Sequence, residues 1–204
     1  YKPKPLGASK HFSQFLHWMN NRGFTPAFKP MRVLDKNEYG WEEFIVQQGC
    51  NTTEEVQRYY NRLGGLLAVL YSMRGTDFHM ENVIASGEHP TPIDLETVFH
   101  NIPALHFQDT ADVEAKKKIV DSVIGTGLLP LLLYQNEEGF GVEMSGMGGG
   151  EQVLPFPVLQ VEHDETDNMR FVRKSKSTKG SENVPSLSGQ RTHAGQYVDE
   201  VVLG

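Results

Sequence analysis

The clearest pattern along the chain is an apolar stripe with helical spacing across residues 53–73, which predicts a helix with one buried face. Its members are Val56, Tyr59, Tyr60, Leu63, Leu66, Leu67 and Leu70. Thr52 and Glu55 stand three positions apart, the spacing of a capping box at the start of a helix. Gly64 and Gly65 each weaken a helix by about 1 kcal/mol, so we expect another backbone to pack closely against them.

Two further helices are predicted at residues 9–21 and 110–124, where apolar residues again recur three and four positions apart. In the first of them, Ser9 is the expected N-cap and Gly23 the left-handed residue after the last turn. We interpret four aromatic side chains as core residues: Phe12, Phe15, Trp18 and Trp41.

Short apolar runs predict strands or strand-like pieces at residues 31–34, 44–46, 83–85 and 93–99. Residues 86–92 between the last two are expected to form a turn. Residues 173–195 contain many Ser, Lys, Gly and Thr residues and are expected to form a loop. Strand pieces around a long central helix, followed by hairpins and more helices, favour an α+β fold.

Composition excludes several classes of protein. The chain has 204 residues and a single cysteine, Cys50, which excludes a disulfide framework and a cysteine-rich zinc site. The net charge of −7 argues against a general nucleic-acid binder. The longest apolar run, residues 128–134, is interrupted by Pro130 and is far shorter than the roughly 20 residues of a membrane helix. A reducing cytoplasm is the expected location. The missing initiator Met and the apolar last residues suggest a piece of a longer protein.

Polar residues gather between Thr76 and Thr97 in an otherwise apolar context. Asp94 and Glu96 lie two apart on a predicted strand, so both carboxylates would point to one face and repel each other unless a cation lies between them. Asn82 offers a neutral oxygen ligand from the preceding loop. Oxygen ligands of this kind suit Mg²⁺, whose coordination shell substrate phosphates commonly complete.

The spacing of these residues is that of a protein kinase. Asp77 and Asn82 lie five apart, and Asp94 follows twelve later after a turn. In that template Asp77 orients the attacking hydroxyl, while Asn82 and Asp94 hold Mg²⁺ against the ATP phosphates. As an alternative, Asp77 and Asn82 are ordinary turn formers. Asp94 and Glu96 would then lie on the solvent-exposed face of an edge strand.

The chain contains no glycine-rich phosphate-binding motif of the G-x-G-x-x-G or G-x-x-x-x-G-K-[ST] type. A phosphate-contacting lysine therefore has to come from elsewhere. Lys2 is a candidate because the residue before a proline is held extended. The alternative is that Lys2 is simply an exposed charge.

Seven segments carry a resemblance to a known family. They read YKPK at 1–4, EYGWEEF at 38–44, GTDFHMENVIA at 75–85, PIDLET at 92–97, TGLLP at 126–130 and, more loosely, TDNM at 166–169 and NVPSLSG at 183–189. Through them the chain resembles the dehydratase domain of class II lanthipeptide synthetases (the LanM type) over almost its whole length.

The resemblance implies a lipid-kinase-like or protein-kinase-like fold, here incomplete at both ends, acting on a ribosomally made precursor peptide. ATP and Mg²⁺ would serve to phosphorylate Ser and Thr, and elimination of the phosphate would leave dehydroalanine or dehydrobutyrine. The residues carried over are Lys2 as the phosphate-contacting lysine, Asp77 as the catalytic Asp, His79 as a site residue beside it, Asn82 and Asp94 as metal ligands, and Glu96 as a further acid.

The elimination step of that family uses an Arg and a Thr, and an Arg suits this task because its planar fork can grip phosphate oxygens bidentately. Here the resemblance points to Arg170, with Arg173 as the competitor. The expected Thr position falls near Lys176, and Thr178 is the nearest Thr. Without the resemblance, this basic run would be read as a solvated loop.

The resulting division of the chain has three parts: strands and a long helix in residues 1–75, a catalytic and metal segment in 76–100, and a helical and loop region with the basic phosphate-handling segment in 101–204. A cyclase domain is expected to follow in the whole protein. Two alternatives remain open: an atypical small-molecule or protein kinase without elimination activity, and an inactive peptide-binding fragment.

Overall fold

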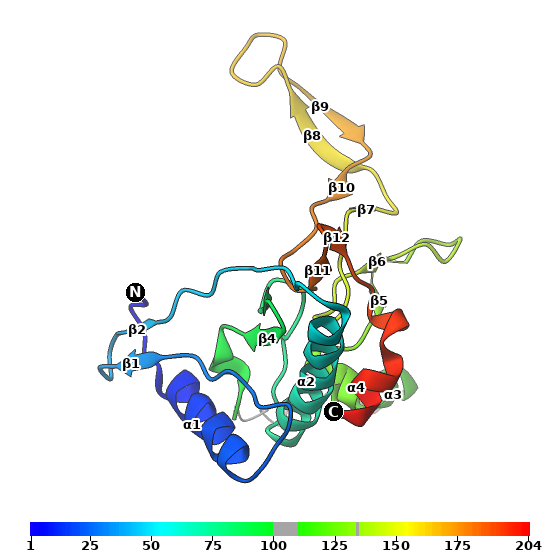
Figure 1. The fold of residues 1–204 in the computed structure, drawn as a ribbon. Coiled ribbons are helices and arrows are strands. Elements are labelled where there is room, and N and C mark those ends of the chain that lie inside the picture. Colours follow the sequence, from blue (N-terminus) through cyan, green and yellow to red (C-terminus); the bar gives the residue numbers. More distant parts are fainter. Residues whose placement is uncertain (100–109, 134) are drawn as a thin grey trace.

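The structure is a computed structural model that describes residues 1–99, 110–133 and 135–204 (Figure 1). Residues 100–109, which fall at the junction of the second and third predicted segments, and Tyr134, the last residue of the apolar run, lie outside the described residues. Within the described ranges, no helix combines the length and apolar character needed to cross a membrane.

Helix α2 (Thr53–Ser72) forms the centre of the core, as its apolar stripe predicts. Tyr59, Tyr60 and Leu63 on that stripe have no exposed surface. At its start the Thr52 side chain accepts a hydrogen bond from the Glu55 backbone N–H. The Glu55 carboxylate in turn accepts a bond from the Asn51 N–H, one residue before the position that a capping box uses.

The two glycines of α2 allow the close packing that the sequence predicts. The short helix α4 (Val198–Leu203) lies against α2, and a Cβ at Gly64 would stand 2.0 Å from the Val201 carbonyl oxygen. A Cβ at Gly65 would stand 2.6 Å from the Phe24 ring. The backbone neighbour predicted from the sequence is thus found at Gly64, whereas Gly65 makes room for an aromatic side chain.

Helix α1 (Gly7–Asn21) confirms the first predicted helix, although it starts before Ser9, which is buried within it. Gly23 has φ +92°, the left-handed conformation expected just after this helix. The assignment of both tryptophans to the core is wrong: Trp18 is 52% and Trp41 is 44% exposed. Trp18 instead stacks on Phe15, and Trp41 meets the ring of Tyr39 edge to face.

The strands of the described residues form six separate antiparallel pairs. They are β1 (Val33–Asp35) with β2 (Gly40–Glu42), β3 (Val83–Ser86) with β4 (His89–Pro92), β5 (Leu132–Leu133) with β6 (Val142–Glu143), β7 (Gln152–Val153) with β10 (Ser177–Thr178), β8 (Val158–Glu162) with β9 (Arg170–Lys174), and β11 (Ser186–Leu187) with β12 (Gln190–Arg191). Helix α3 (Ala111–Val120) and short 3₁₀ turns at Leu95–Thr97, Val123–Thr126 and Ala194–Gln196 complete a mixed α+β fold.

Several strand predictions need correction. Residues 93–99 are no strand, because β4 ends at Pro92, Asp94 takes a left-handed φ of +52° and a 3₁₀ turn follows. The turn between β3 and β4 is only two residues long and starts with Gly87 at φ +61°. Residues 44–46 form no strand, whereas 173–195 contain β10, β11 and β12 rather than loop alone. Short strands with few apolar residues give little period-two signal.

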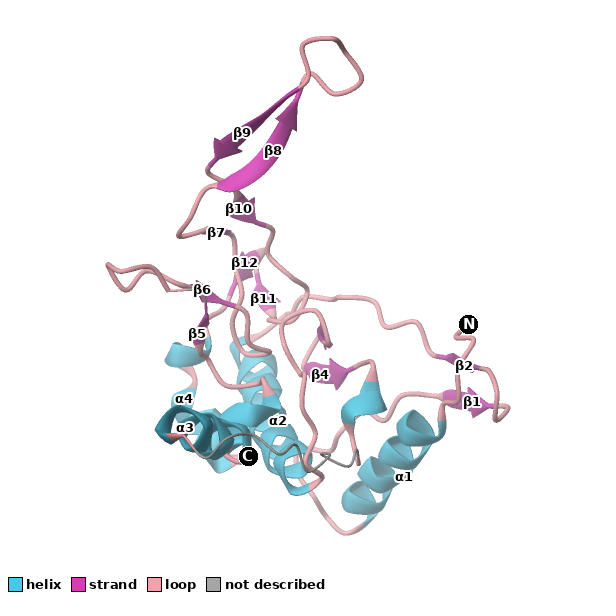
Figure 2. Ribbon diagram, turned by 180° about the vertical axis from the view of Figure 1, so that it is seen from behind, coloured by secondary structure: helices cyan, strands magenta, loops and turns pink. Residues whose placement is uncertain are grey.

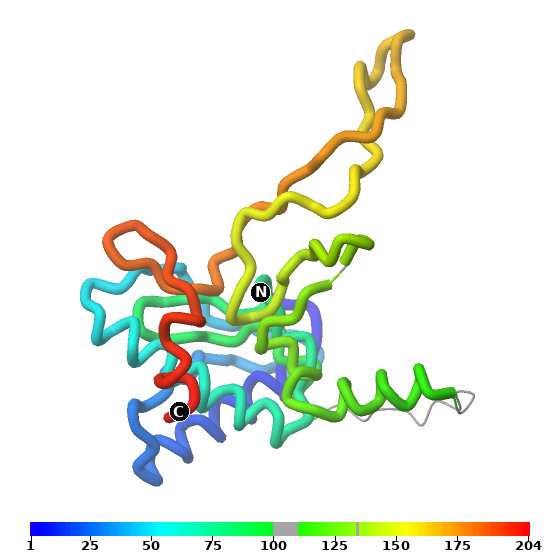
Figure 3. The backbone as a smooth tube through the Cα atoms, turned by 90° about the vertical axis from the view of Figure 1, so that its right-hand side faces the viewer, coloured from blue at the N-terminus to red at the C-terminus, as the bar shows by residue number. Residues whose placement is uncertain are grey.

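The helices gather on one side of the molecule, and the β8–β9 hairpin projects away from them (Figures 1 and 2). The side view in Figure 3 shows the same projection. The predicted helix at 110–124 corresponds to α3 followed by the 3₁₀ turn Val123–Thr126.

The glycine contacts give a test of the packing between α2 and α4. We expect Gly64→Ala to lower the free energy of unfolding by about 1–3 kcal/mol, because its methyl group overlaps the Val201 carbonyl. The matched control is Gly7→Ala in α1, where a Cβ meets nothing within 4 Å and which we expect to be neutral or slightly stabilising. Equal unfolding midpoints in urea for the two variants would contradict this packing.

Candidate functional site

The loop from Thr76 to Asn82 runs between two other segments of the chain. The Phe78 N–H donates to the Thr126 carbonyl and the Met80 N–H to the Met144 carbonyl, each at 2.9 Å. Phe78 and Met80 are buried, so the alternate residues of the loop point away from the core. This alternation presents Asp77 and His79 on the outer side.

Two glycines let the neighbouring segments approach this loop. Gly127 has φ +82°, and a Cβ there would lie 3.1 Å from the Phe78 nitrogen. A Cβ at Gly146 would lie 2.5 Å from the Phe78 carbonyl oxygen. The position of the loop therefore depends on residues about 50 and 70 positions later in the chain.

Asp77, His79 and Asn82 form the first group of predicted site residues. The Glu81 N–H donates to His79 Nδ1, and His79 Nε2 lies 3.4 Å from both Asp77 Oδ1 and Asn82 Nδ2. The Asn82 side-chain amide donates to the Asp77 carbonyl at 2.9 Å and so fixes the orientation of Asn82. Asp77 has a left-handed φ of +68°, a conformation that strains an ordinary residue and clusters at functional sites.

Asp94 and Glu96 belong to a second group, built with the N-terminal segment. Lys2 pairs with Gly40 through two backbone hydrogen bonds of 3.0 Å. Its ammonium group binds the Asp94 carboxylate and lies 3.3 Å from the carboxylate of Glu42. Lys4 binds Glu96 and lies 3.7 Å from Asp94 Oδ1. Three carboxylates and two ammonium groups thus alternate in one cluster.

The charges of this cluster shift the pKa values of two of its members. The hydrogen bond from Lys2 lowers the pKa of Asp94 below its ordinary value, and the charge of Lys4 adds to this effect. Burial alone would lower the pKa of Lys2, but the hydrogen bond to Asp94 and the charge of Glu42 outweigh it and raise this pKa. Both groups are therefore charged near neutral pH.

The two groups are neighbours that are joined through backbone. The Ile93 N–H donates to the Asn82 carbonyl at 2.9 Å, which places Asp94 just beyond the end of the β3–β4 ladder. The Thr97 hydroxyl donates to the Thr76 carbonyl. Among the described residues, no hydrogen bond or ion pair joins the side chains of Asp77, His79 or Asn82 to those of Asp94 or Glu96.

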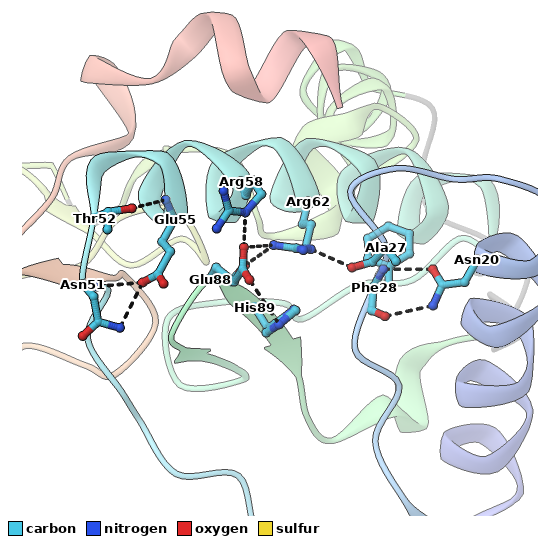
Figure 4. A network of polar contacts seen from close by, with 10 residues as sticks. All are labelled: Asn20, Ala27, Phe28, Asn51, Thr52, Glu55, Arg58, Arg62, Glu88 and His89. Atoms are coloured by element: carbon cyan, nitrogen blue, oxygen red, sulfur yellow. Dashed lines mark hydrogen bonds and ion pairs between the residues drawn. The ribbon is translucent and has the colours of Figure 1, made fainter.

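The hairpin that carries Asp94 is fixed to α2 by a charged network (Figure 4). Glu88, in the β3–β4 turn, pairs with Arg58 and with Arg62, whose Nη1 lies 3.0 Å from the carboxylate. Arg62 also donates to the carbonyls of Glu88 and Ala27, at 2.8 and 2.7 Å. Its side chain is only 7% exposed, so these contacts satisfy a buried charge.

The residues predicted for the elimination step lie elsewhere. Arg170 is at the outer end of the β8–β9 hairpin, where its Nε and Nη2 bind the Glu162 carboxylate at 2.9 and 2.7 Å. Thr178 is in β10, and its hydroxyl donates to the Gly150 carbonyl at 3.2 Å. The structure brings these two residues neither to each other nor to the acids.

The oxygen atoms of the two groups could supply only part of the coordination shell of a magnesium ion. Asn82 Oδ1 has no protein donor among the residues that the structure describes, and Asp94 is ionised. No set of three His, Cys, Asp or Glu residues within the described ranges could hold a metal. Mg²⁺ is commonly bound by one or two protein oxygens with water and phosphate completing its shell, which is what Asn82 and Asp94 could provide.

A pocket of about 350 Å³ lies beside the loop rather than over the acids. It is lined by Tyr71, Arg74, Gly75, Thr76, Val120, Asp121, Ser122, Gly125 and Thr126. Neither Asp77 nor Asp94 lines it. The pocket therefore adjoins the loop at Gly75 and Thr76 but does not include these two carboxylates.

Sequence reasoning missed two members of the second group, Lys4 and Glu42. The alternation of an extended chain puts Lys2 and Lys4 on the same side, and this signal could have identified Lys4. Glu42 lies two residues after Gly40, the backbone partner of Lys2, and only the pairing of these segments brings it near.

Comparison with known proteins adds to this geometry. A family model described as "Domain of unknown function (DUF4135)" matches residues 1–204. The chain belongs to the DUF4135 family. A relative of this DUF4135 chain is the lacticin 481/lactococcin biosynthesis protein LcnDR2 of Lactococcus lactis subsp. lactis, 38% identical over 160 residues. These residues make up 74% of this chain and 17% of the relative.

The relative confirms the resemblance to class II lanthipeptide synthetases that the sequence segments indicate, since lacticin 481 biosynthesis is lanthipeptide biosynthesis. The DUF4135 chain spans about a sixth of the length of that relative.

The buried end of the charged network gives a pH prediction. Burial, with help from Arg62, lowers the pKa of His89 to about 4, and its Nδ1 has no hydrogen-bond partner. The unfolded chain binds a proton near pH 6.5 and the folded chain does not, so stability falls as the pH drops below 6.5. We expect a loss of up to about 2 kcal/mol between pH 6.5 and 5, measured by urea unfolding.

His89→Gln should flatten this slope, whereas His17→Gln, at an exposed position of α1, should keep it. Wild type and His89→Gln with the same slope over this range would show that His89 is not the responsible group.

Proposed function

We propose that this chain is the ATP-using part of a synthetase that dehydrates Ser and Thr residues of a ribosomal precursor peptide, on a kinase-like fold. The observation that supports this best is the contact between Lys2 and Asp94, which lie 92 positions apart. A lysine that pairs with a metal-binding Asp next to an Asp–His–Asn loop is the arrangement a phosphoryl-transfer site needs. The kinship with a lacticin 481 biosynthesis protein supports the choice of substrate.

In the phosphorylation step, Asp77 accepts the proton of a peptide Ser or Thr hydroxyl. The hydroxyl oxygen bonds to the γ-phosphorus, the bond from that phosphorus to the β–γ bridging oxygen breaks, and ADP leaves. His79 Nε2, 3.4 Å from Asp77, orients the carboxylate. Lys2 contacts the phosphates, while Asn82 and Asp94 hold Mg²⁺, which when bound neutralises phosphate charge.

The charge of the second group explains why a metal is needed. Glu42, Asp94 and Glu96 carry three negative charges against the two positive charges of Lys2 and Lys4. A triphosphate without a divalent cation would approach a net negative cluster and be repelled. We therefore propose that nucleotide enters this site only as the magnesium complex.

The elimination step breaks the Cα–H and Cβ–O bonds of the phosphorylated residue and forms a Cα=Cβ bond, with the proton passing to a base and the phosphate leaving. Arg170 is the proposed cation for the leaving phosphate and Thr178 the proposed second residue of this step, although the two lie on different strand pairs. In this structure Glu162 neutralises Arg170, so the β8–β9 hairpin has to exchange that partner for the phosphate. Arg173, on the opposite face of the hairpin, is the competing candidate.

The separation of Arg170 from Asp94 also favours a second candidate, a kinase that phosphorylates without eliminating. The chain spans 17% of the relative, and we propose that the cyclase function resides in the part of such proteins beyond this chain. The precursor peptide and that cyclase domain are the proposed partners, and a reducing cytoplasm that supplies ATP is the proposed location.

Replacing the proposed metal ligand tests the proposal in the intact protein that carries this chain. Asp94→Asn should abolish Mg²⁺-dependent ATP binding and peptide modification, and so should removal of Mg²⁺ from the wild type with EDTA. The control Asp112→Asn changes an exposed carboxylate of α3 that pairs with Lys116 and should leave both unchanged. Unchanged turnover of Asp94→Asn would reject the metal role.

Mass spectrometry of the peptide distinguishes the two candidates. Loss of one water per Ser or Thr supports the dehydratase, whereas a stable product that retains a phosphate group supports the kinase. Arg170→Met should convert the first outcome into the second if Arg170 serves elimination. A wild type that neither binds Mg·ATP nor changes the peptide mass would leave the inactive peptide-binding alternative.

A further inference from the structure

The N-terminal segment places two ammonium groups, not one, at the proposed metal-binding carboxylate. Lys2 and Lys4 flank Pro3, whose ring fixes φ and holds the residue before it extended. Both side chains therefore reach the same side. Lys2 binds Asp94 Oδ1, and Lys4 Nζ lies 3.7 Å from the same oxygen.

The contacts of Lys4 contribute little to the stability of the fold. Its ion pair with Glu96 is exposed, with side chains 39% and 62% accessible to solvent. Exposed pairs of this kind typically contribute 0 to about 1 kcal/mol. The rigid segment between Pro3 and Pro5 thus positions an accessible cation whose removal the fold tolerates.

A divalent cation bound at Asp94 would compete with both ammonium groups, because Lys2 and Lys4 both approach the carboxylate at Oδ1. When Asp94 turns its carboxylate to a divalent cation, Lys2 retains Glu42 at 3.3 Å, and Lys4 retains only the exposed Glu96. The oxygens of a triphosphate are then the densest negative charge within reach of the Lys4 ammonium group. A charge-assisted hydrogen bond to phosphate is stronger than an exposed ion pair with a carboxylate.

We propose that Lys4 is a second phosphate-binding residue, which contacts the β- or γ-phosphate of the nucleotide beside Lys2. This inference rests on the proposed function, because it names a further substrate contact of the same site. Glu96 is then a positioning residue, which keeps the Lys4 side chain near Asp94 until nucleotide binds.

The test compares nucleotides that differ in their number of phosphates, in the intact protein. Dissociation constants of Mg·ATP, Mg·ADP and AMP are measured by competition with a fluorescent nucleotide for wild type, Lys4→Met and Lys2→Met. Lys10→Met, an exposed lysine of α1, is the matched control. Lys4→Met should raise the dissociation constant of Mg·ATP by about tenfold or more and change that of AMP less than twofold.

A purely structural role of Lys4 predicts a different pattern, with ATP and AMP binding weakened to the same extent. A role only through Glu96 predicts that Glu96→Gln weakens Mg·ATP binding as much as Lys4→Met does, whereas the proposal predicts a smaller effect of Glu96→Gln. Either pattern overturns the proposal. A third result also overturns it: Lys4→Met binds Mg·ATP as tightly as Lys10→Met does, and Lys2→Met no longer binds it. In these cases the proposed function stands, whereas a wild type that binds no Mg·ATP overturns both.

Discussion

The geometry of the site depends on the hydrogen bonds and the ion pair that the buried guanidinium group of Arg62 makes. This group joins three parts of the chain: α2 on which it stands, the carbonyl of Ala27, and both the carboxylate and the carbonyl of Glu88. Loss of one partner of such a buried pair typically costs about 3–5 kcal/mol, because a charge is left without compensation. The network therefore fixes the β3–β4 hairpin on the central helix and, with it, the start of the turn that holds Asp94.

From this fixed hairpin the site is built mostly by backbone. Hydrogen bonds from Ile93 to Asn82 and from Thr97 to Thr76 align the two acidic segments. Gly127 and Gly146 let later segments pack directly against the Phe78 backbone. These contacts hold the loop in place without using the side chains of Asp77 and His79, which face outward.

The second group illustrates how charges can hold a site together before its ligand arrives. Lys2 and Lys4 separate three carboxylates that would otherwise repel one another, and the pKa shifts of Lys2 and Asp94 express this mutual stabilisation. The same balance leaves a net negative charge on the cluster, and the proposed requirement for a divalent cation rests on this charge.

Some of this could be predicted from the chain alone. The stripe of α2 and its two glycines predicted a buried central helix with a close neighbour, because a helical period and a missing side chain are local signals. The spacing of Asp77, Asn82 and Asp94 identified candidate residues, although their roles remain predictions. The prediction of a strand at 93–99 was wrong, because an alternating sequence cannot show that Asp94 takes a left-handed φ.

Tertiary structure alone decided which distant groups meet. Local pattern does not encode that Lys4 reaches Glu96 or that Glu42 faces Lys2, because these contacts follow from how the N-terminal segment docks on β2 and beside the 3₁₀ turn. The positions of Arg170 and Thr178 on separate strands follow from the pairing of the later hairpins. Residue types and their periods lie in the sequence, whereas contacts between segments depend on packing that many sequences can share.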